Sequence, residues 1–132
     1  MTPGPHLALL RGDTFAERFT GLGDLSTVDE IWFTVKARTS HPDANAVLQV
    51  SKTGGLLAVA GAPAPVPANG VIAIVAPPTA GIIDVTVEAE EMAKLSTRNV
   101  GYWDIQTLAG TVVKTVRRGN AQTVGDVTRS VI

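Results

Sequence analysis

The feature that most constrains the fold of this chain is its share of β-branched residues. Val, Thr and Ile number 17, 15 and 7, so together they make up 39 of the 132 residues. Their side chains are stiff at χ1 and suit the pleated surface of a sheet. Glycine and proline, with 13 and 8 residues, separate short apolar runs along the chain. This pattern is typical of an all-β sandwich or barrel, and the length corresponds to one domain.

The apolar runs predict ten strands, at residues 6–10, 14–20, 30–37, 46–52, 56–60, 71–75, 82–87, 101–107, 111–118 and 123–127. In two of them the side chains alternate in character, which places neighbours on opposite sheet faces. Residues 30–37 set Ile31, Phe33 and Val35 against Trp32, Thr34 and Lys36, and residues 101–107 set Trp103, Ile105 and Thr107 against Tyr102, Asp104 and Gln106. We expect a core of Phe19, Ile31, Phe33, Val35, Leu48, Val85, Val87, Ile105, Val113 and Val116.

Two connections can also be predicted. Residues 108–110 separate two strands and end in Gly110, so they indicate a three-residue hairpin loop with the glycine at positive φ. Residues 88–95 are free of Gly and Pro and place acidic residues before Lys94, which favours one short helix resting on a sheet edge.

The organisation we expect is a single domain over residues 1–132 with three accessory segments. An N-terminal arm covers residues 1–6, an Ala/Pro-rich insertion covers residues 61–81, and a C-terminal tail covers residues 125–132. The insertion favours an extended path and encloses the predicted strand at 71–75. The arm and the tail look extended.

Composition excludes several classes of function. The net charge of −1 and the pI of about 6.1 argue against nucleic acid or a membrane surface as partner. The absence of cysteine excludes a disulfide framework, a thiolate zinc site and a cysteine nucleophile. No segment has the pattern of a signal peptide or a membrane-spanning helix, so we expect the cytoplasm, or a particle assembled there.

Candidate catalytic and metal-binding residues are few. The two histidines, His6 and His41, do not stand at the spacing of a metal site, and the turn-forming string around His41 favours a loop. Ser40 beside His41 lacks the G-x-S-x-G turn of a hydrolase nucleophile. The acids at 88–91 could supply two carboxylates for glycoside hydrolysis, but acids in a first helical turn are usually solvated. We therefore predict no catalytic residue, no cofactor, no metal ion and no small-molecule substrate.

Two glycine-containing motifs have simple structural interpretations. Gly54-Gly55 is followed by two leucines instead of the Lys-Ser/Thr of a phosphate-binding loop, so it predicts a hairpin turn. Arg11-Gly12-Asp13 matches an integrin-binding tripeptide, but three residues are a weak signal, and a bend between two strands is favoured.

Charge is unevenly distributed near the C-terminus. Residues 111–132 carry Lys114, Arg117, Arg118 and Arg129 against Asp126, whereas residues 82–104 carry five acids against Lys94 and Arg98. This asymmetry could serve self-association or docking on a partner of opposite sign, or it could form ion pairs within the surface.

The order of short motifs adds a family resemblance over residues 8–130. The motifs are RGDT at 11–14, WFTVK at 32–36, PDANAVLQVS at 42–51 before Gly54-Gly55, YWDIQ at 102–106, Gly110, KTV at 114–116, Gly119 and DVTR at 126–129. In this order they resemble small β-sandwich modules of tailed-bacteriophage virion proteins, namely the N-terminal domains of baseplate upper proteins and of tail-fibre or receptor-binding proteins. The resemblance implies an immunoglobulin-like antiparallel β-sandwich and a structural role in a virion without catalysis.

This resemblance leads to an expected function and an expected set of contacts. The chain would be a tail, baseplate or fibre-attachment piece or a capsid decoration protein, located in the virion and bound to other virion proteins as a homo-oligomer or symmetric array. Neighbouring chains would hold its ends by adding a strand to an exposed edge. The candidate assembly contacts are Pro3, Pro5, Pro63, Pro65, Pro67, Arg117, Arg118, Val127, Arg129 and Ile132. The alternative is a carbohydrate- or receptor-binding adhesin module that reads its ligand through Trp32 or Trp103.

Overall fold

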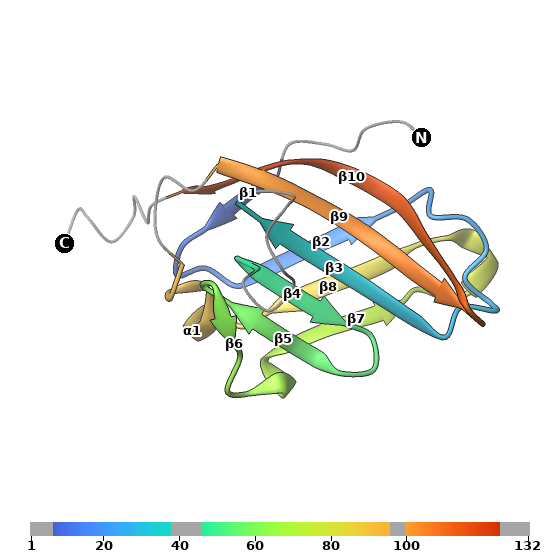
Figure 1. Cartoon of the computed structure of the whole chain (residues 1–132), viewed down its shortest axis with the longest axis horizontal. Helices are drawn as coiled ribbons and strands as arrows, with labels where there is room; N and C mark the ends of the chain where they lie inside the picture. The colour runs from blue at the N-terminus through green and yellow to red at the C-terminus, as the bar shows by residue number, and fades with distance from the viewer. Residues whose placement is uncertain (1–6, 38–45, 96–99, 125–132) are drawn as a thin grey trace.

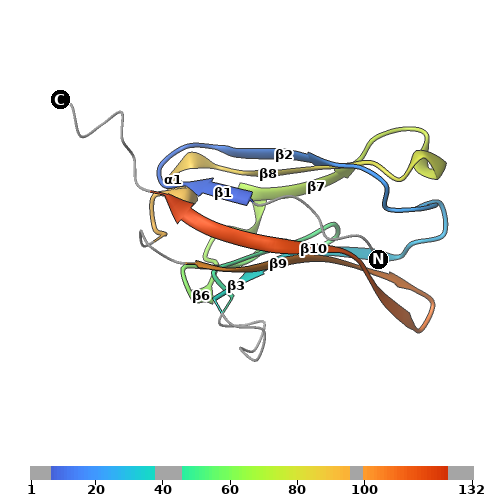
Figure 2. The ribbon, with the colours of Figure 1, turned by 90° about the horizontal axis from the view of Figure 1, so that it is seen from above.

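A computed structural model describes residues 7–37, 46–95 and 100–124, and it contains two stacked β-sheets (Figures 1 and 2). The larger sheet has seven strands, in the order β1 (Leu7–Leu10), β10 (Val112–Val124), β9 (Val100–Ala109), β3 (Glu30–Lys36), β4 (Leu48–Ser51), β5 (Gly55–Val59) and β6 (Ala62–Pro63). The smaller sheet has the order β2 (Phe15–Phe19), β8 (Ile83–Val87) and β7 (Gly70–Ile74). The helical elements described are η2 (Pro67–Asn69), η3 (Pro78–Ala80) and α1 (Ala89–Met92).

The strands predicted from sequence are present, with two differences. Residues 111–118 and the described start of 123–127 belong to one long strand, β10, which stays paired with β9 from Val112 to Gln122. The second difference is β6, a two-residue strand within the Ala/Pro-rich insertion that the sequence does not indicate. The predicted short helix is confirmed, although its α-helical part covers only four residues.

The hairpin turn predicted between residues 101–107 and 111–118 exists, but it is tighter than expected. Val112 pairs with Ala109, so Gly110 and Thr111 alone form the β9–β10 loop, and the prediction of a three-residue loop is wrong. Gly110 does have a φ of +61°, and its N–H donates to Asp29 Oδ2 at 2.8 Å. This additional acceptor holds the tight turn against the chain that enters β3.

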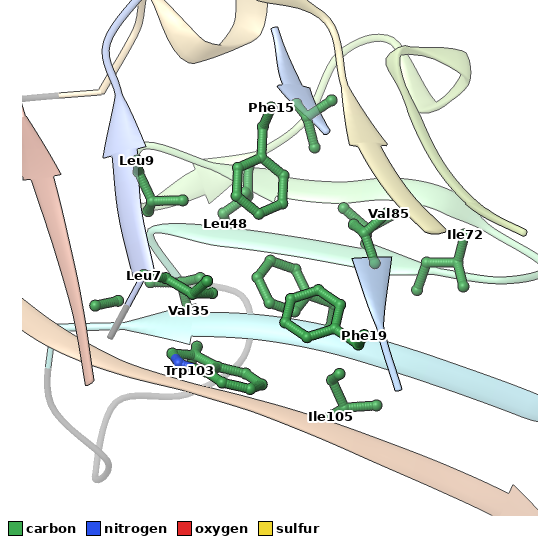
Figure 3. Close-up of a cluster of buried hydrophobic side chains, with 14 of the residues drawn as sticks. Leu7, Leu9, Phe15, Phe19, Val35, Leu48, Ile72, Val85, Trp103 and Ile105 are labelled. Atoms are coloured by element: carbon green, nitrogen blue, oxygen red, sulfur yellow. The ribbon is translucent and has the colours of Figure 1, made fainter. Parts of the chain in front are cut away.

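An aromatic cluster fills the space between the two sheets (Figure 3). Phe15 and Phe19 come from β2, Phe33 from β3 and Trp103 from β9. The Phe19 and Trp103 rings have centroids 5.0 Å apart, and Phe33 lies 5.4 Å from Phe19 and 5.6 Å from Phe15. All four side chains are buried, so rings from both sheets pack together at the centre of the sandwich.

The predicted core is confirmed at eight of its ten positions and is wrong at Val113. That side chain is 55% exposed, and Val116 is only half-buried. The β9–β10 pairing shifts between Thr115 and Arg117, where β10 contains a bulge. An extra residue in one strand reverses the sheet face on which the residues before it lie. Val113 therefore lies opposite Leu108, on the outer face of the sheet.

Helix α1 is anchored by a buried carboxylate. Glu91 is 1% exposed, Lys94 Nζ lies 2.5 Å from its Oε1, and Asn69 Nδ2 donates to its Oε2 at 3.1 Å. Asn69 also donates to Glu90 Oε1 at 3.0 Å. Burial raises the pKa of the Glu91 carboxyl, but the contact with Lys94 and the hydrogen bond from Asn69 outweigh it, so the pKa lies below its ordinary value.

This carboxylate should make the stability depend on pH in acid. A carboxyl group whose pKa is lower in the folded chain stabilises the fold at pH values above its pKa in the unfolded chain, about 4.3. This stabilisation is lost as the pH falls through the pKa of the group in the folded chain. Urea unfolding between pH 7 and pH 3 should therefore show a smaller loss of unfolding free energy for Glu91→Gln than for the wild type. Glu88→Gln, at an exposed position beside the same helix, should keep the wild-type slope, and equal slopes for all three proteins would contradict the assignment.

Candidate functional site

A groove of about 430 Å³ lies on the outer face of the seven-stranded sheet. It crosses three adjacent strands and is lined by residues that we call the sheet groove, which are Thr34, Lys36, Tyr102, Trp103, Asp104, Arg118, Gly119 and Asn120. Its volume lies in the range of binding pockets for small ligands or inserted side chains. A second hollow, beside Leu9, Val35 and Ala121, holds only about 10 Å³.

The register of the strands explains how the groove forms. Residues directly opposite each other in a sheet share a face. Tyr102 on β9 lies between Lys36 on β3 and Asn120 on β10, which makes one row across the groove. The next row consists of Thr34, Asp104 and Arg118. The Trp103 ring belongs to the core cluster, so its ring is not available at the groove surface.

The groove offers groups that can recognise a polar or charged partner. Tyr102 is 49% exposed and Arg118 is exposed, while Lys36 and Asp104 are half-buried. Asp104 is the one carboxylate among the lining residues, which include no His, Cys or Ser. An aromatic ring, a guanidinium, an ammonium, an amide and a carboxylate are groups that bind a polar or charged partner.

The structure places the candidate assembly residues in separate locations. Arg118 lines the groove, whereas Arg117 faces the other way and donates to the Thr20 carbonyl at 3.0 Å. Pro63, Pro65 and Pro67 are exposed near β6 and η2, at the far edge of the large sheet. The remaining candidates lie outside the described residues, and they are Pro3, Pro5, Val127, Arg129 and Ile132.

Two of the acidic residues at 88–91 are held by neighbouring side chains. Glu90 and Glu91 share the amide of Asn69, and Glu91 is closed off from solvent and paired with Lys94. Over the three described stretches, no group of His, Cys, Asp and Glu comes together that could hold a metal ion. His6, Ser40 and His41 lie outside those stretches. Likewise, no helix among the described residues is long and apolar enough to cross a membrane.

The remaining motifs have structural roles. Arg11-Gly12-Asp13 forms the bend between β1 and β2, with the Asp13 N–H donating to the Leu10 carbonyl at 3.1 Å. Gly54 and Gly55 lie at the β4–β5 turn, as predicted. Part of the charge asymmetry is internal, because Arg18 pairs with Asp84 through two contacts of 2.8 and 3.0 Å across β2 and β8.

Comparison with known proteins supports the architecture. No protein-family model and no curated protein matches the chain. Among solved structures, a chicken TCR is similar with a TM-score of 0.50 and 5% sequence identity. The match covers 95% of this chain and 50% of the TCR chain, so this chain spans half the length of that neighbour. The fold is an immunoglobulin-like β-sandwich.

The strand order corresponds to the variable type of immunoglobulin-like fold. That type extends the G-F-C sheet by two strands, C′ and C″, opposite a sheet that contains B, E and D. Here β10, β9 and β3 match G, F and C, β4 and β5 match the two additional strands, and β2, β8 and β7 match B, E and D. Antibody domains join B and F by a disulfide. In this cysteine-free chain, Phe19 on β2 and Trp103 on β9 pack against each other instead.

Sequence reasoning missed most of the groove. Among its lining residues, the sequence indicates Arg118 as an assembly contact and Trp103 as a ligand-reading residue of the adhesin alternative. The alternation in residues 101–107 does place Tyr102 and Asp104 on one face, and the alternation in 30–37 does the same for Thr34 and Lys36. The missing information is that β3, β9 and β10 are neighbours, because strand pairing joins residues far apart in sequence.

Proposed function

We propose that this chain is a non-enzymatic structural component of a tailed-phage virion that works through protein–protein contacts. The proposal combines the motif resemblance with the character of the sheet groove. The component would be a tail, baseplate or fibre-attachment piece, or a capsid decoration protein.

The observation that carries the proposal is the groove, because it joins an exposed aromatic ring to charged groups. Tyrosine and arginine are enriched among residues that dominate protein–protein binding energy. Tyr102 and Arg118 lie in neighbouring rows of the groove, on adjacent strands. A side chain or loop of a virion protein would fill the hollow and contact both.

Replacing Arg118 by Glu should strongly reduce incorporation of the chain into particles. The change reverses a charge in the groove without touching the core. Phage particles assembled with the variant would be purified on a density gradient, and the chain counted by immunoblot against a capsid protein. We expect about a tenfold or greater loss, since reversing a charge at an interface costs more than 1.4 kcal/mol when the groups are desolvated.

Lys114→Glu provides the matched control for this test. Lys114 is an exposed cation on the same strand, beyond the bulge and outside the groove. It undergoes the same charge reversal and should leave incorporation unchanged. Absence of the wild-type chain from purified particles would refute the virion role, and equal loss from both variants would refute the groove as the contact.

A carbohydrate-binding adhesin is the second candidate, and the Tyr102 ring favours it. Sugars stack on exposed rings, and Tyr102 is 49% exposed beside the Asn120 amide. The Trp103 side chain is buried, so its position does not support the expectation that it binds a glycan. Trp32 is half-buried and lies outside the groove. Binding on a glycan array that disappears in Tyr102→Ala and persists in Trp32→Phe would favour the adhesin over the structural role.

A further inference from the structure

The two edges of the three-stranded sheet differ in how they are protected. β8 is the central strand, and over the described residues both β2 and β7 pair with β8 alone. An edge strand presents unpaired backbone N–H and C=O groups, which can pair with another chain. Natural sheets protect such edges with charged residues, prolines, bulges or very short strands.

The β2 edge carries such a protection. Glu17 pairs with Val85 and shares the sheet face of Phe15 and Phe19, both of which point into the core. Glu17 itself remains exposed. A charged residue on the inward face of an edge strand cannot be buried by a second sheet edge without losing its hydration, so it disfavours pairing at this edge.

The β7 edge has no such residue. Its sequence, Gly-Val-Ile-Ala-Ile, contains neither a charge nor a proline, and its five residues form no bulge in their pairing with β8. Val71 is 50% exposed and Ala73 is exposed on the outer face. This edge is therefore an apolar strand without a charge, a proline or a bulge to oppose a partner.

More exposed apolar surface lies beside this edge. Leu57 on β5 is 37% exposed, and Val66 before η2 is 46% exposed. Both β7 and η2 contact β5, so these side chains lie at the side of the sandwich where β7 is the edge of its sheet. They enlarge the apolar area available to a partner that pairs with β7.

We propose that the β7 edge binds the β7 edge of a second copy of this chain. The two strands would run antiparallel about a twofold axis at Ile72 and join the two small sheets into one of six strands. In this register Val71 of each copy lies opposite Ala73 of the other on the outer face, a large side chain beside a small one. The charged residues on the outer face of the small sheet, Arg18 and Asp84, neutralise each other, so no like charges oppose the approach.

The other edges of the described chain are poorer partners for β7. β2 carries Glu17, and β6 has two residues and contains Pro63. The four-residue β1 edge would make a head-to-tail contact that leaves a free β7 and a free β1 at the ends of each assembly. A twofold β7 pair uses the same surface on both copies and closes.

This inference deepens the proposed assembly role by naming one partner, and it uses the sheet opposite the one that carries the groove. It can be tested without particles, by sedimentation equilibrium of the purified full chain from micromolar to millimolar concentration. We expect a monomer–dimer equilibrium in the wild type. The double variants Val71→Lys/Ala73→Lys and Val71→Glu/Ala73→Glu should each weaken the dimer by about tenfold or more, because like charges then face each other across the axis.

Mixing the two double variants tests the register itself. In the proposed pairing each lysine of one variant faces a glutamate of the other, so the mixture should form a heterodimer that neither variant forms alone. Ala16→Lys is the matched control, since Ala16 and Val71 flank the same residue, Thr86, at the two edges of the sheet. It should leave dimerisation unchanged, and circular dichroism should show that all variants are folded.

Three results would overturn the inference. A wild type that is monomeric over the whole range would exclude the dimer, and a dimer that survives both double variants would place the contact elsewhere. A mixture of the double variants that stays monomeric would exclude the register centred on Ile72. Arg118→Glu should keep the wild-type dimer, so failure of the groove proposal and failure of the edge proposal give different results.

Discussion

Trp103→Ala should lower the free energy of unfolding by about 3–5 kcal/mol, the usual cost of removing a large buried aromatic side chain. The Trp103 ring is 1% exposed and lies 5.0 Å from Phe19 and 6.2 Å from Phe33, measured between ring centroids. Its loss would leave a cavity at the point where the two sheets meet, with no disulfide to hold them (Figure 3). Urea unfolding followed by circular dichroism measures the change.

Val113→Ala separates this effect from a general sensitivity of the β9–β10 hairpin. Val113 lies on the same hairpin but is 55% exposed, so it buries little surface. We expect its replacement to change the unfolding free energy by no more than about 0.5 kcal/mol. A loss of similar size in both variants would mean that Val113 packs in the core after all, as expected from the sequence.

Gly81→Ala should have the second large effect, a loss of about 2–5 kcal/mol of unfolding free energy. Gly81 has a φ of +70°, a conformation that costs other residues about 1–2 kcal/mol. A Cβ there would also lie 2.5 Å from the carbonyl oxygen of Gly23 and 2.7 Å from its nitrogen. The loop carrying Gly81 is bound to this neighbour, because the Leu22 N–H donates to the Gly81 carbonyl at 3.0 Å. Backbone must therefore move to admit a methyl group, which adds about 1–3 kcal/mol.

Gly110→Ala isolates the conformational part of that cost. Gly110 has a similar φ of +61°, but a Cβ there would have no atom within 4 Å. The expected loss is about 1–2 kcal/mol, from the left-handed conformation alone. If both glycine variants lose the same free energy in urea unfolding, the close approach of the two loops at Gly81 contributes nothing and the prediction fails.

The contrast between these variants reflects what can be read from local sequence. The need for glycine at position 110 follows from its place between two strands, and the sequence predicts a hairpin there. The crowding at Gly81 cannot be predicted in this way, since it depends on a loop more than fifty residues away, at Gly23. The same distinction separates Val113 from Trp103. Both are apolar residues of predicted strands, and a bulge between Thr115 and Arg117 turns Val113 to the outer face.

The sheet groove shows most clearly what local sequence cannot predict. Alternation assigns Thr34 and Lys36 to one face of their strand, and Tyr102 and Asp104 to one face of theirs. It contains no signal that these two faces adjoin, or that Asn120 completes the row. The edge argument is similar, because Glu17 and Val71 become comparable only when β2 and β7 are known to flank the same strand.

The amino-acid sequence alone determined the all-β class, the position of nearly every strand, the short helix and most of the core. These properties follow from χ1 stiffness, a period of two and turn residues, all of which act over a few neighbouring positions. Tertiary structure alone decided the strand order, the single long β10, the outward position of Val113, the sheet groove and the contrast between the β2 and β7 edges. Each of these depends on which distant segments pack together, a choice made by burying the faces of two whole sheets against each other.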